Sequence, residues 1–149
     1  MSVTGQLADH QARCLAHLIS LRMLAQTEPG ALLPRRVVVE VARATGAVVA
    51  EAEAAGQAVL TAGPGGPHRG DGAFLRVRLD RLAAAADDAV AAARAGNAAE
   101  LRRHLRRFDT LTAAIWTVQD ALSRASGPPG RAVRPPPRGS VTLPGPSRT

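Results

Sequence analysis

The sequence predicts an all-α protein, an antiparallel four-helix bundle followed by a disordered, Pro- and Arg-rich C-terminal tail. Three observations support this fold class. Four segments carry apolar residues at helical spacing, Gly and Pro residues separate them, and no series of β-hairpin turns occurs. The predicted bundle is residues 1–126, with helices at about 4–26, 34–62, 72–95 and 98–126, and the tail is 127–149.

The first two helices have different apolar stripes. The first stripe has heptad-like spacing and ends before Pro29-Gly30, whereas the second opens at Pro34 and consists of small residues that permit close packing. The first comprises Leu7, Cys14, Leu18, Leu21 and Ala25, and the second Val37, Val41, Ala44, Val48, Ala52, Ala55 and Val59. Residues 36–41 are rich in the β-branched residue Val and could begin as a strand, but the long Ala-rich continuation favours a helix.

A Gly- and Pro-rich loop over 63–72 separates the second helix from the third, for which Asp71 is the predicted N-cap. Residues 74–79 alternate apolar residues with Arg, as a strand does, but the Ala-rich sequence that follows favours a helix. Its predicted buried stripe is Leu75, Leu79, Leu82, Ala86, Ala89 and Ala93.

The strongest local signal is Gly96-Asn97 followed by Glu100. Gly is the preferred residue just past a helix C-terminus, and Asn-x-x-Glu resembles a capping box at the next N-terminus. The third and fourth helices should therefore form a tight antiparallel hairpin. The apolar arc of the fourth helix is Leu101, Leu105, Phe108, Leu111, Ile115, Val118 and Leu122.

The charge balance is only mildly basic once the tail is set aside. All 19 basic residues are Arg, a preference typical of a GC-rich genome, and the chain has 12 acidic residues. Four Arg lie in 127–149, which leaves 15 against 12, or +3, on the rest of the chain. A single Cys excludes an internal disulfide, and no signal peptide or apolar membrane span is apparent. We expect a cytoplasmic protein.

The predicted first helix carries His10, Cys14 and His17 within one sector of its circumference. Imidazole and thiolate groups suit zinc or copper, and His104 could supply a fourth ligand from across the bundle. The alternative is that Cys14 is a small hydrophobic residue of the core, flanked by the two histidines. For His104 the alternative is a half-buried residue that pairs with Glu100 one turn earlier.

The fourth helix carries four arginines opposite its apolar arc, namely Arg102, Arg103, Arg106 and Arg107. Clustered guanidinium groups can bind the phosphates of a nucleic acid. The small net charge and the lack of a helix-turn-helix pattern or of stacking aromatic residues favour a solvated face instead.

The same helix also suggests a protein interface. Trp116 lies at the edge of the apolar arc beside Asp109 and Asp120, and an edge Trp can anchor a partner. Thr112 and Gln119 fall near the centre of the arc, where polar residues either set helix register or face a second chain.

We find no catalytic carboxylate pair, Ser-His-Asp set, phosphate-binding Gly loop or CxxC pair in the sequence. We therefore expect no enzymatic activity and no cofactor. The leading hypothesis is a small helical protein that acts through protein association, as a homo-oligomer or a regulatory partner. The alternative is a nucleic-acid-associated protein that uses the Arg face and the tail, and no membrane partner is expected.

Overall fold

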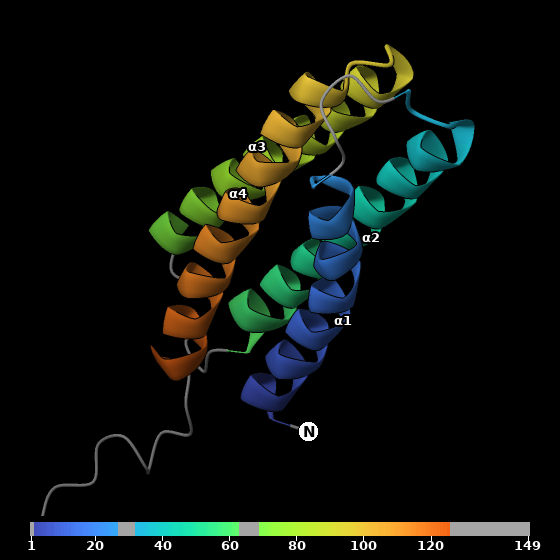
Figure 1. Ribbon diagram of the computed structural model, residues 1–149. Coiled ribbons are helices and arrows are strands. Elements are labelled where there is room, and N and C mark those ends of the chain that lie inside the picture. Colours follow the sequence, from blue (N-terminus) through green and yellow to red (C-terminus); the bar gives the residue numbers. More distant parts are fainter. Residues whose placement is uncertain (1, 27–31, 63–68, 126–149) are drawn as a thin grey trace, which may run out of the picture.

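The protein is an all-α bundle of four helices, as predicted (Figure 1). The computed structural model describes residues 2–26, 32–62 and 69–125. Its helices are α1 (Val3–Leu24), α2 (Arg35–Thr61), α3 (Arg69–Arg94) and α4 (Ala98–Ala125). The predicted tail at 127–149 and most of the predicted loop at 63–72 lie outside the described residues.

Helix α1 begins after Ser2, whose hydroxyl oxygen accepts a hydrogen bond from the Gly5 N–H at 3.0 Å. This bond satisfies one of the free donors at the helix N-terminus. Leu7, Cys14, Leu18 and Leu21 are buried as predicted. The heptad-like spacing therefore identified the core face of α1 correctly.

The two segments that resembled strands are both helical. Residues 36–41 form the start of α2, and residues 74–79 lie inside α3. Each is continuous with a long Ala-rich segment, and propagation of an existing helix costs far less than nucleation of a new element. The strong helix propensity of Ala therefore overrides the local β preference of these short runs.

The boundary between α3 and α4 follows the prediction in detail. Gly96 adopts a φ of 72°, and the Gly96 N–H and Asn97 N–H donate to the carbonyls of Ala93 and Ala92. This pattern is a Schellman motif. The Asn97 side chain then accepts from the Glu100 N–H at 3.1 Å and caps α4. The reciprocal half of the capping box is missing, because the Asn97 N–H is already used by the Schellman motif.

Helix α3 begins three residues earlier than predicted, at Arg69 instead of residue 72. The prediction that Asp71 is the N-cap residue is therefore wrong, because Asp71 lies within the first turn. An acidic residue is also favourable there, since the free N–H groups give the helix N-terminus a partial positive charge. That preference does not distinguish the cap from the first turn, which explains the error.

The bundle consists of two antiparallel pairs, α1 with α2 and α3 with α4, that lie side by side (Figure 1). Helices α2 and α4 contact each other across the bundle, whereas α1 and α3 make no contact within the described residues. The largest fully buried side chains come from all four helices and include Phe108, Leu18, Leu75, Leu82, Leu101 and Ile115. Helix α1 therefore packs only against α2 and α4.

Substitution of Gly96 by Ala should destabilise the protein by about 1 kcal/mol, because a Cβ atom is strained at positive φ. Gly46 provides a matched control, since it is exposed within α2 and a Cβ there would meet no atom within 4 Å. Gly46→Ala should stabilise the protein by about 0.5–1 kcal/mol. Urea unfolding of both variants measures the two changes. Equal effects of the same sign would contradict this account of the hairpin.

Candidate functional site

The geometry required for the predicted metal site is not present among the described residues. No group of three or more His, Cys, Asp or Glu side chains there is arranged to hold a metal ion. His10 lies 3.3 Å from Glu51 of α2 and 3.1 Å from Arg13. His104 pairs with Glu100 at 3.4 Å, near the α3–α4 turn.

The antiparallel pairing of α1 with α4 explains why His104 cannot join the two histidines of α1. Arg22 of α1 pairs with Asp109 of α4, and Gln11 of α1 pairs with Asp120. Residue numbers therefore rise along α4 as they fall along α1. His104 therefore lies beyond the level of Arg22, about 15 Å along the helix axis from His17. The predicted alternative, a half-buried His104 beside Glu100, is what the structure contains.

Cys14 is a residue of the core. It is 1% exposed, and its thiol donates a weak hydrogen bond to the Val48 carbonyl at 3.8 Å. Burial raises the pKa of this thiol to about 11, and the nearby Glu51 carboxylate acts in the same direction. A thiol that remains protonated at neutral pH is neither a nucleophile nor a ready metal ligand.

The Arg face of α4 is exposed but partly neutralised within the chain. Arg103 pairs with Glu100 on the same helix, and Arg107 lies 3.6 Å from Asp88 of α3. Arg106 is exposed, and Arg102 is half-buried. Exposed ion pairs of this kind contribute little to stability, but they reduce the positive potential that a polyanion would meet.

The acidic residues beside Trp116 link α4 to α1. Asp109 accepts two hydrogen bonds from the Arg22 guanidinium, at 2.7 and 2.8 Å, and Asp120 accepts one from the Gln11 amide at 3.1 Å. Trp116 lies between these two links and packs partly buried against the core. The predicted interface edge of α4 is thus largely an internal contact with α1.

Thr112 and Gln119 are fully buried within the bundle, so they offer no surface to a partner of this folded chain. The Thr112 hydroxyl donates to the Phe108 carbonyl at 2.9 Å. The Gln119 amide nitrogen donates to the Ala52 carbonyl of α2 at 2.9 Å, while its oxygen is buried without a hydrogen-bond partner within the described residues. Of the two roles predicted for these residues, only a role inside the bundle fits their position.

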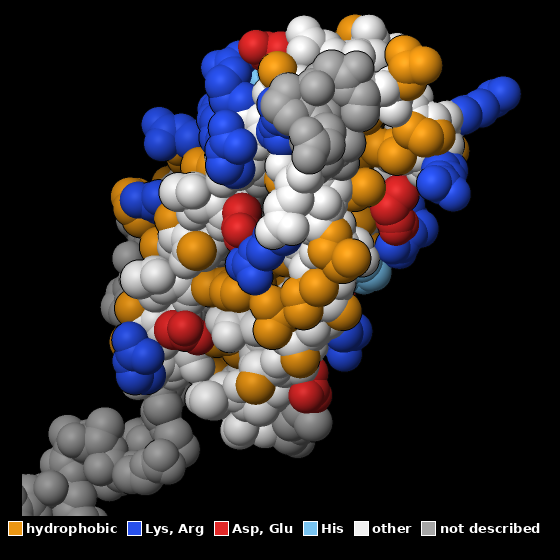
Figure 2. All heavy atoms as spheres, in the orientation of Figure 1, with side chains coloured by type: hydrophobic (Ala, Val, Ile, Leu, Met, Phe, Trp, Pro, Cys, Tyr) orange, Lys and Arg blue, Asp and Glu red, His pale blue; other side chains and the backbone are white. Residues whose placement is uncertain are grey.

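An exposed apolar face on α1 was not predicted. We call it the α1 stripe and define it as the exposed apolar side chains on the side of α1 turned away from α2, between Arg22 and Asp9 on the helix circumference. Its members are all exposed: Ala8, Ala12, Leu15, Ala16, Ile19 and Met23. Leu15, Ile19 and Met23 are 41%, 49% and 69% exposed. Figure 2 shows hydrophobic side chains gathered on the face where α1 and α4 lie.

Trp116 lies at the contact between α4 and the α1 stripe's own helix. Gln11 and Arg22 bind Asp120 and Asp109 of α4, and Trp116 lies between those two positions. Its side chain packs partly buried against the core, on the side of α1 that carries Cys14. The edge Trp that the sequence suggested therefore belongs to the α1–α4 contact, and the exposed apolar face belongs to α1. The spacing of Leu15, Ile19 and Met23 was the signal that could have revealed it.

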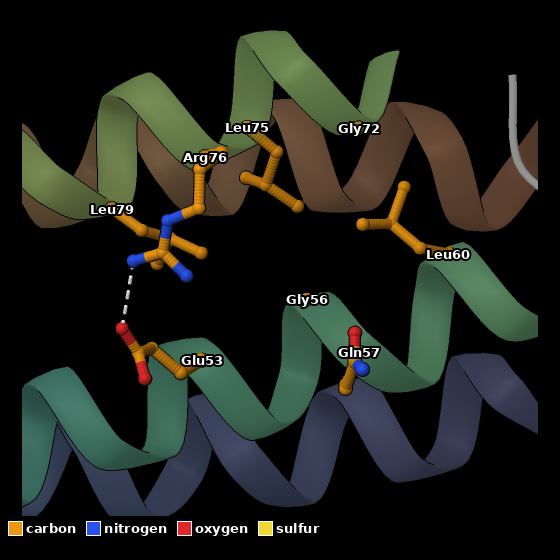
Figure 3. Close-up of a pocket in the computed structure, with 8 residues that line it drawn as sticks. All are labelled: Glu53, Gly56, Gln57, Leu60, Gly72, Leu75, Arg76 and Leu79. Carbon is orange, nitrogen blue, oxygen red and sulfur yellow. Dashed lines mark hydrogen bonds and ion pairs between the residues drawn. The ribbon is translucent and has the colours of Figure 1, made fainter. Parts of the chain in front are cut away.

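A groove of about 320 Å³ lies between α2 and α3 (Figure 3). Glu53 and Arg76 form an ion pair of 2.8 Å at one end, and Leu60 and Gly72 lie at the other. Gly56 forms part of the wall, and a Cβ atom there would lie 3.1 Å from Leu75. The two ionisable residues of the lining neutralise each other, so the groove presents no charged group arranged for acid–base chemistry.

Comparison with protein-family models, with curated proteins and with solved structures gave no match for this chain. Within the described helices, none combines the length and apolarity needed to cross a membrane. The candidate functional site is the α1 stripe, the exposed apolar face beside the α1–α4 contact.

The raised pKa of Cys14 makes stability depend on pH in an alkaline window. Below pH 9 the thiol is protonated in both states, and between pH 9 and about 11 it ionises only in the unfolded chain. The free energy of unfolding should thus fall by about 2 kcal/mol across this window. The chain contains no Lys or Tyr that would titrate in the same range.

Urea unfolding of the wild type at pH 8, 9, 10 and 11 measures this loss. The Cys14→Ala variant is the control, and its stability should change little over the same range, because the titrating group is gone. A wild-type stability that stays constant, or an equal loss in the variant, would contradict the assigned burial of the thiol.

Proposed function

We propose that this protein acts through protein association, and that the α1 stripe is its contact surface. The observation that carries the proposal is the exposure of Leu15, Ile19 and Met23 on one side of a helix whose other side is packed in the core. A row of large apolar side chains on the surface costs free energy, because it exposes hydrocarbon to water. Contiguous apolar surface of this kind is typical of a protein contact.

The composition of the α1 stripe also fits a contact surface. Interface cores are depleted of charged residues and enriched in Met and in aromatic residues. The stripe contains no charged residue, and it includes Met23. The links Arg22–Asp109 and Gln11–Asp120 hold α4 against α1, so the surface is supported by two helices.

The nucleic-acid alternative has less support from the same structure. Arg103 and Arg107 of the Arg face pair with carboxylates, and the face includes no aromatic residue on which a base could stack. If four phosphates were nevertheless contacted, binding to duplex DNA should weaken with a log–log salt slope of about −3.6. A slope near this value, lost in Arg102→Glu with Arg106→Glu, would favour the alternative.

Ile19→Glu should abolish association, because it places a charge in the centre of the apolar face. The matched control is Val77→Glu, since Val77 lies on α3 and is 49% exposed, the same value as Ile19. Each variant is purified under native conditions from its host, and bound chains are identified and quantified by mass spectrometry, with a second copy counted as a partner.

The proposal expects a stoichiometric bound chain with the wild type, with Val77→Glu and with Arg102→Glu plus Arg106→Glu, but not with Ile19→Glu. Circular dichroism confirms that all variants retain the wild-type helix content. Equal recovery of the bound chain with Ile19→Glu, or no stoichiometric chain with the wild type, would refute the proposal.

A further inference from the structure

We infer that the occupant of the α1 stripe is the α1 stripe of a second copy, packed antiparallel about a two-fold axis. This inference rests on the proposed function and makes it specific. It follows from the order of side-chain sizes along the stripe and from the absence of charged side chains within it.

Small and large residues are segregated along the α1 stripe. The N-terminal half carries Ala8 and Ala12, the C-terminal half carries Ile19 and Met23, and the middle pairs Leu15 with Ala16. In one antiparallel register, Ala8 of one copy lies level with Met23 of the other and Ala12 with Ile19, while Leu15 meets Leu15 and Ala16 meets Ala16 beside the two-fold axis. Ile19 and Met23 therefore meet small residues, so the two helices can approach closely at both ends of the contact.

A parallel arrangement lacks this complementarity. It sets Met23 against Met23 and Ile19 against Ile19, while Ala8 meets Ala8. The large residues would hold the helices apart at one end and leave a void between the alanines at the other. Voids and overpacking both destabilise an interface, because the atoms around them lose contacts or are strained.

The charged residues that flank the α1 stripe leave the contact itself uncharged. Between Asp9 and Arg22 on its circumference, the described length of α1 presents no charged side chain, so the contact buries no charge. Arg22 at one edge already pairs with Asp109 of its own chain, and Asp9 lies at the other edge. The choice between the two arrangements therefore depends on the order of side-chain sizes.

The size of the contact sets the expected strength of the dimer. From Ala8 to Met23 the stripe is about 22 Å long, so one helix face contributes less than the roughly 800 Å² per partner of a standard interface. The dimer should therefore be reversible and should dissociate on dilution. Ile19→Glu should convert it to the monomer, whereas Val77→Glu should leave it unchanged.

Single cysteines placed on the exposed stripe test the register directly in the full chain. Under mild oxidation, Ala16→Cys should give a covalent dimer of doubled mass, since the two positions lie beside the two-fold axis. Met23→Cys alone should give none, because its two copies would lie about 22 Å apart along the helix axis. A mixture of Ala8→Cys and Met23→Cys proteins should give a cross-linked heterodimer. The wild type, whose Cys14 is buried, is the control for background oxidation.

Cross-linking of Met23→Cys with itself would overturn the antiparallel register. A molar mass by light scattering that stays at the monomer value of 15.4 kDa into the millimolar range would overturn self-association. The proposed function would survive that second result if a different chain were recovered stoichiometrically and lost in Ile19→Glu. It would fall together with the inference if no bound chain were found.

Discussion

The close approach of α2 to α4 is the constraint on which the rest of the bundle depends. The Gln119 amide of α4 donates to the Ala52 carbonyl of α2 at 2.9 Å, and a Cβ atom on Gly56 would lie only 3.7 Å from the same amide nitrogen. Small residues on α2 let a long polar side chain reach its backbone. Because a buried amide costs free energy unless it is hydrogen-bonded, this contact fixes the relative position of the two helices.

The arrangement of α1 and α3 follows from this contact between α2 and α4. With α2 and α4 in contact across the bundle, α1 and α3 are held on opposite sides and make no contact within the described residues. Helix α1 is consequently packed against α2 on one side, where His10 and Arg13 bind Glu51, and against α4 on the other. Its remaining side stays uncovered, and the α1 stripe is the result. The same packing that completes the core therefore leaves a large apolar face exposed.

Most of the fold could be predicted from sequence because it depends on local signals. The apolar period located all four helices, and Gly96 with Asn97 specified the hairpin through backbone conformation and capping. The environment of Thr112 and Gln119 could not be predicted in this way. Helical spacing gives the angle of a residue around its own helix, but it does not say whether another helix of the same chain covers that angle. The exposure of Leu15 and Ile19 was missed for the same reason.

The codon composition of the chain bears on the proposed role of the α1 stripe. In a GC-rich genome, residues whose codons begin with two A or T letters are depleted, and this chain has no Lys or Tyr at all. After Met1, those that persist are Ile19, Met23, Phe74, Asn97, Phe108 and Ile115. Phe108 and Ile115 fill the core, and Asn97 caps α4. Ile19 and Met23 fill no core position, since each is about half exposed or more. Phe74 of α3 is also 49% exposed, and the Arg78 guanidinium lies 4.4 Å from its ring centroid. In the proposed contact of the α1 stripe with another chain, Ile19 and Met23 would gain the free energy of burial that they lack in the folded monomer.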